Sequence, residues 1–136
     1  MTTTLPTRGQ LERSLSQQIQ ALYRSQLGHR VSEVDCALLE TKIAIVLEQS
    51  LTQPEQLLAE QGKDELVNEL HTELDAAIRP QLKELIEAVV GVPVIDLLSD
   101  STLKTARTGM IVMLAEAPQI RDAASRATAP TQASTK

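Results

Sequence analysis

The chain has 136 residues, which corresponds to one domain. Its formal net charge is −5 and Tyr23 is its only aromatic residue, so it is a poor candidate for nucleic-acid binding. The single cysteine, Cys36, excludes an internal disulfide and fits a reducing compartment, so we expect a cytoplasmic protein. The longest apolar run, Met110 to Ala115, is far shorter than the roughly 20 residues of a membrane helix, so we expect no membrane insertion.

The first predicted element is a helix over residues 8 to 27, after a flexible N-terminus over residues 1 to 7. Thr7 and Gln10 have the spacing of a capping box, in which two side chains satisfy the first free N–H groups of a helix. Apolar residues then repeat at helical spacing, and Gly28 stands where a left-handed C-terminal cap is expected.

Two strands are predicted next. Val34, Cys36 and Leu38 alternate with polar residues, as in a strand with one buried face. The run from Ile43 to Leu47 is apolar at every position, which is typical of a strand covered on both faces. The short link between them predicts an antiparallel hairpin. Cys36 falls on the apolar side, so we interpret it as a buried structural thiol.

A short helix is predicted from the capping-box spacing of Thr52 and Glu55. A long helix follows from Asp64 until Gly91 ends it, because apolar residues keep helical spacing throughout. Pro80 lies inside this helix, where it removes a backbone hydrogen bond, so we expect a kink or a break there.

Polar residues on the long helix include His71 and Asp75, one turn apart. A metal site would need a third ligand, and the sequence contains neither an HExxH motif nor a pair of cysteines. We therefore predict no metal site and interpret His71 as part of a solvated helix face.

The last two strands are predicted over residues 92 to 98 and 110 to 115. The polar segment between them, residues 99 to 108, is interpreted as a long hairpin connection whose hydroxyl groups satisfy nearby backbone groups. Residues 117 to 136 are rich in Ala, Thr and Ser without apolar periodicity, and we predict a disordered tail there.

These elements give the order α-β-β-α-β-β, an α+β fold with a four-stranded, mainly antiparallel sheet and two main helices in one domain over residues 8 to 116. Two helices packed on one face would leave apolar residues of the second and fourth strands in water, and such exposed area usually marks an interface. Either the helices divide between the two faces, or a second copy covers the open one. We favour a homodimer.

Several segments resemble the MpsC-like family: YRSQLGHRVSEV, KIAIVLEQSLTQPEQLL, LDAAIRPQLKELIEAVVGVPVIDLLSD and LKTARTGMIVML. The resemblance covers about residues 8 to 115. It implies a soluble component of a sodium-translocating system that generates membrane potential, in contact with the periphery of a membrane protein complex. The positions that match the family motif are Arg79, Pro80, Asp96, Asp100, Lys104 and Thr105.

A ligand site is the second possibility for residues 99 to 108, because cations and hydroxyl groups suit an anion. The candidate ligand-binding residues are Arg79, Asp100, Lys104, Thr105 and Arg107. Phosphate cradles, however, use successive N–H groups of a glycine-rich turn or a helix N-terminus, and the nearest glycine, Gly109, follows the segment. The hairpin interpretation is therefore favoured.

No nucleophile stands beside a base in the sequence, so we expect no enzyme, no catalytic residue and no cofactor. The leading hypothesis is an accessory or regulatory protein that acts through protein contacts within a sodium-translocating membrane system. The alternative is a module that senses a small ligand or an anion through residues 99 to 108. Stabilisation by a phosphate-bearing metabolite would favour the alternative.

Overall fold

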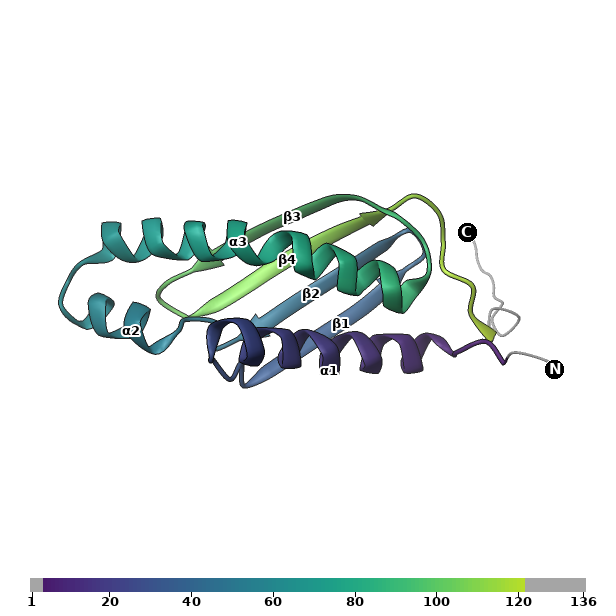
Figure 1. Cartoon of the computed structure of the whole chain (residues 1–136), viewed down its shortest axis with the longest axis horizontal. Coiled ribbons are helices and arrows are strands. Elements are labelled where there is room, and N and C mark those ends of the chain that lie inside the picture. The colour runs from purple at the N-terminus through teal and green to yellow at the C-terminus, as the bar shows by residue number, and fades with distance from the viewer. Residues whose placement is uncertain (1–3, 122–136) are drawn as a thin grey trace, which may run out of the picture.

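A computed structural model describes residues 4 to 121 of the chain. The elements are α1 (Arg8–Leu27), β1 (Glu33–Leu39), β2 (Lys42–Glu48), α2 (Gln53–Glu60), α3 (Asp64–Val90), β3 (Val94–Thr102) and β4 (Arg107–Leu114). The strands form an antiparallel sheet in the order β1-β2-β4-β3, and α1 and α3 lie side by side across the same face of it (Figure 1). The predicted α+β fold is confirmed.

The hydrophobic core lies between this face of the sheet and the two long helices. The apolar side of α1 contributes Leu11, Leu15, Ile19 and Tyr23. Alternate residues of the strands complete the core, because successive side chains of a strand point to opposite faces: Val34, Leu38, Ile43, Ile45, Leu47, Met110, Val112 and Leu114. The capping box of Thr7 and Gln10 is present, and Gly28 adopts the left-handed conformation, with φ of 62°.

α3 runs through Pro80 without a break. The break that we expected there is therefore wrong. Ile78 and Leu82, on either side of the proline, are both buried in the core, whereas Pro80 itself is exposed. Packing on both sides holds the helix together although one backbone hydrogen bond is missing.

β3 and β4 extend well into the segment predicted as a connection. β3 continues to Thr102 and β4 begins at Arg107, so only residues 103 to 106 link them. Ser99 pairs with Met110, and Ser101 pairs with Thr108. The prediction of a long connection is wrong because the inward positions here carry hydroxyl groups, which hide the alternation of a half-buried strand.

The sheet face opposite the helices, called the open face below, is left uncovered by the described residues. Its apolar side chains include Val46 (39% exposed), Leu98 (54%) and Ile111 (40%). They come from β2, β3 and β4, between the alternate residues that fill the core. The helices therefore do not divide between the two faces, which excludes one of the two arrangements expected from the sequence.

The two ends of the described chain lie next to each other (Figure 1). The backbone N–H of Arg121 donates a hydrogen bond to the Pro6 oxygen at 2.8 Å. Pro118 is buried and Ile120 packs against the core, so residues 117 to 121 lie against the domain. The rest of the predicted tail, residues 122 to 136, lies outside the described residues, as do residues 1 to 3.

Candidate functional site

A fully buried carboxylate stands at the start of α2. Glu55 lies in the first turn of this helix, and its Oε1 accepts hydrogen bonds from the backbone N–H and the hydroxyl of Thr52, at 2.8 and 2.9 Å. The capping box predicted from the sequence is thus present. Because the free N–H groups of a helix N-terminus carry partial positive charge, this position favours the ionised carboxylate.

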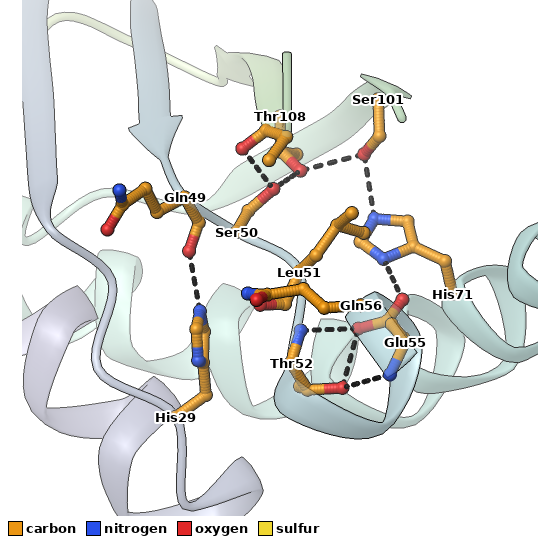
Figure 2. A network of polar contacts seen from close by, with 11 residues as sticks. His29, Gln49, Ser50, Leu51, Thr52, Glu55, Gln56, His71, Ser101 and Thr108 are labelled. Carbon is orange, nitrogen blue, oxygen red and sulfur yellow. Dashed lines mark hydrogen bonds and ion pairs between the residues drawn. The ribbon is translucent and has the colours of Figure 1, made fainter. Parts of the chain in front are cut away.

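His71 on α3 binds the second oxygen of this carboxylate. The distance from His71 Nδ1 to Glu55 Oε2 is 2.7 Å, and the distance from His71 Nε2 to Ser101 Oγ on β3 is also 2.7 Å (Figure 2). Our interpretation of His71 as part of a solvated helix face is therefore wrong. Helical periodicity could not reveal these partners, because they lie 16 and 30 residues away in the sequence.

A chain of hydroxyl groups continues from His71 into the sheet (Figure 2). Ser101 Oγ lies 2.7 Å from Thr108 Oγ1, which lies 2.8 Å from Ser50 Oγ. The Ser50 hydroxyl also lies 3.2 Å from the backbone oxygen of Ala106, in the turn between β3 and β4. We call Ser101, Thr108 and Ser50 the hydroxyl relay. It connects His71 with this turn.

The pair of Glu55 and His71 is an ion pair when His71 is protonated. Burial raises the pKa of Glu55, but the hydrogen bonds from His71 and Thr52 together outweigh burial and lower this pKa below its ordinary 4.5. The hydrogen bond to Glu55 raises the pKa of His71 above its ordinary 6.5, although burial opposes this shift. Each partner thus stabilises the charged form of the other.

The order of carboxylate, imidazole and serine hydroxyl is that of a catalytic triad. No nucleophile stands beside a base in the sequence, but the fold brings the Ser101 hydroxyl to His71. Ser101, however, lies within β3, and its hydroxyl is also bonded to Thr108. Cavities lined by described residues lie beside Gly91, along the outer sides of α2 and α3, and between Arg79 and β3, and Ser101 lines none of these.

Comparison with known families decides the membership of the chain. Residues 7–116 match the family described as "Na+-translocating membrane potential-generating system (MpsC)". The chain belongs to the MpsC family. The resemblance predicted from the sequence is confirmed. Neither the curated proteins nor the solved structures contain a match to the chain.

The system named by the MpsC description works at a membrane. Within residues 4 to 121, none of the helices combines the length and the apolar composition that crossing a membrane requires.

The positions that we matched to a family motif from the sequence resemblance are spread over the molecule. Arg79 is held against β3: its Nη2 donates to Asp75 Oδ2 at 2.8 Å and to Ser99 Oγ at 3.0 Å, and its Nη1 donates to a backbone oxygen of β3. Pro80 and Asp96 are exposed. Arg79 thus fastens α3 to the edge strand of the sheet.

The other candidate ligand residues lie around the end of the β3–β4 hairpin. Asp100 is exposed on β3, and Lys104 and Thr105 are exposed in the turn. Arg107 donates from Nε to Glu48 Oε1 at 2.8 Å. The structure therefore brings Asp100, Lys104 and Thr105 to one end of the hairpin, while Arg79 and Arg107 hold partners of their own.

Metal ligands and the thiol of Cys36 are two further features with possible chemical roles. Among the described residues, no group of three or more His, Cys, Asp and Glu side chains is placed to hold a metal ion. Cys36 is half-buried, and burial raises the pKa of its thiol, which keeps the thiol protonated. This environment matches a structural cysteine better than a reactive one.

Proposed function

We propose that this MpsC-family protein is an accessory component of a Na+-translocating membrane system, and that it acts from the membrane periphery through protein contacts and not through catalysis. Family membership supports the first part, because the family description names such a system. The open face supports the second part, because contiguous exposed apolar area on a folded domain usually marks an interaction surface.

A second copy of this chain is the proposed occupant of the open face. β2 and β4 are the central strands, so a twofold axis parallel to them would place β2 of one copy over β4 of the other. Ala44 and Ile111 lie at the same level of these strands, as do Val46 and Gly109. The twofold would therefore place each large side chain over a small residue of the other copy.

Charges on the two central strands suit the same arrangement. Glu48 and Arg107 lie at the same level of β2 and β4 and form an ion pair within the chain. The twofold would place Glu48 of each copy over Arg107 of the other, which makes a cluster of four alternating charges. Asp35 and Asp100 would face each other across the outer strands, at the rim, where water and salt screen like charges.

The homodimer is tested by light scattering after size exclusion, over a dilution series. The wild-type chain, 14.8 kDa, is expected at twice its mass, and Ile111→Asp is expected as a monomer because it places a charge in the centre of the open face. The matched control is Leu66→Asp, which changes an exposed leucine on α3 and should leave the dimer intact. A wild-type monomer at every concentration would overturn the homodimer but leave the membrane role open.

The membrane role is tested in cells that lack this protein. We expect a smaller Na+-dependent membrane potential, measured with a voltage-sensitive dye, which the wild-type chain restores and Ile111→Asp does not. A potential that does not change on loss of the protein would contradict the proposed role. Full restoration by a monomeric Ile111→Asp would show that the open face serves another purpose.

A further inference from the structure

The hydrogen bonds that run from Glu55 through His71 and the hydroxyl relay to Ala106 are compatible with a neutral His71. Nδ1–H then donates to the Glu55 carboxylate, and the bare Nε2 accepts a hydrogen bond from Ser101. Each hydroxyl of the relay donates toward His71. The Ala106 oxygen keeps the hydrogen bond from the backbone N–H of Ser50, at 2.8 Å.

The same contacts are also compatible with a protonated His71, provided that every hydroxyl of the relay donates its hydrogen bond in the opposite direction. Nε2–H now donates to Ser101 Oγ, so each hydroxyl must donate to the next one along the relay. The last hydroxyl, that of Ser50, donates to the Ala106 oxygen at 3.2 Å. Protonation therefore turns the contact with Glu55 into an ion pair and adds a second hydrogen bond at the turn.

We propose that His71 is a pH-responsive latch that, when protonated, fastens α2 and the first half of α3 to the end of the β3–β4 hairpin. Glu55 belongs to α2, His71 to α3 and the relay to β3, β4 and the segment after β2, so one side chain joins all of these elements. The latch is independent of the proposed function, because it rests on this network and not on the open face or the family.

The groups around His71 set the direction of the response. Glu55 on α2 and Asp75 on α3 both favour the protonated imidazole. The strand contact to His71 is the uncharged hydroxyl of Ser101 on β3. Tyr23 of α1 lies near both carboxylates, and burial raises the pKa of its phenol, so Tyr23 stays neutral over the working range. Arg79 pairs with Asp75 at 2.8 Å and moderates its charge.

The effect on stability has a defined sign. Since the pKa of His71 is raised on folding, its contribution is fully present below pH 6.5 and is lost as the pH rises through the raised value. Since the pKa of Glu55 is lowered, its contribution is fully present above pH 4.5 and is lost as the pH falls through the lowered value. Both contributions are therefore fully present between pH 4.5 and pH 6.5, where the latch is closed. The latch opens as the pH rises through the raised pKa of His71.

Nuclear magnetic resonance of the imidazole rings tests the first half of the proposal. The chain has two histidines, so a His29→Gln variant assigns the signals. We expect a His71 pKa above 6.5 in the wild-type chain and a lower one in Glu55→Gln, which keeps the shape of the carboxylate but removes its charge. A wild-type pKa at or below 6.5 would overturn the latch.

Amide hydrogen exchange tests the second half. After correction for intrinsic rates, we expect protection of α2 and of the first half of α3 to fall several-fold between about pH 5.5 and about pH 8.5, with α1 as the internal reference. In His71→Gln, a side chain that hydrogen-bonds but does not titrate, this pH dependence should disappear. Equal protection of these helices at both pH values in the wild-type chain would overturn the latch, even if His71→Gln failed to fold.

Discussion

At the scale of single residues, Glu55 uses its two oxygens for two different partners. Oε1 closes the helix cap with Thr52, and Oε2 holds His71. The cap could be predicted from the sequence because its partners lie three residues apart. The partner on α3 could not, since only the packing of α3 beside α2 brings the imidazole to the carboxylate. The same limit applies to Ser50 and Thr108, which are 58 residues apart.

The reactivity of Ser101 tests the proposal that this protein does not act through catalysis. A fluorophosphonate, which reacts with activated serines, is expected to leave Ser101 unmodified, because Ser101 lies within a strand and its hydroxyl is also bonded to Thr108. Intact-mass measurement, with Ser101→Ala as the comparison, gives the readout. Modification at Ser101 that is lost in His71→Gln would instead indicate a hydrolase.

At the scale of elements, the helices follow their sequence patterns more closely than the last two strands do. The bounds predicted for α1 are those observed, because caps and apolar spacing are both local. β3 and β4 are longer than predicted, since Ser99, Ser101 and Thr108 fill inward positions that an apolar pattern would have marked. Apolar periodicity does not identify buried polar residues, because their burial depends on hydrogen-bond partners that are distant in the sequence.

Pro80 gives a prediction for α3. Pro80→Ala supplies the missing N–H to a helix that is already continuous, so we expect the free energy of unfolding to rise by about 2 kcal/mol, after allowance for the stiffness that proline gives the unfolded chain. Urea denaturation measures this change. Glu84→Ala, at an exposed site on the same helix, is the control and should change stability by less than about 0.5 kcal/mol. An unchanged or lower stability of Pro80→Ala would contradict this prediction.

At the scale of the whole molecule, the two layers leave one broad surface without a partner. The doubly apolar pattern of β2 and β4 was visible in the sequence, and the structure shows that both long helices cover the same face. The identity of what covers the other face could not be predicted from periodicity, because a helix layer and a second sheet require the same apolar residues.

A substitution at Gly109 tests the proposed dimer without disturbing the fold of the single chain. A Cβ at this position meets nothing within 4 Å in the single chain, so Gly109→Val should fold with unchanged or higher stability, by up to about 1 kcal/mol. In the proposed dimer the same side chain would collide with Val46 of the other copy, and we expect the dissociation constant to rise by about tenfold or more. Analytical ultracentrifugation measures it. A dimer as tight as the wild type would exclude this twofold.

The hydrogen bond between Arg121 and Pro6 holds the two ends of the described chain together, which determines how two copies could be joined in one chain. Both ends of the described chain leave from one pole, opposite α2 (Figure 1). A twofold axis along the strands would bring the four ends of a dimer to the same pole, whereas an axis across the strands would send them to opposite poles. A tandem gene fusion that joins residue 121 of one copy to residue 4 of the next through a short linker could therefore close into a single-chain dimer only in the first geometry. Its folding would report the orientation of the two sheets.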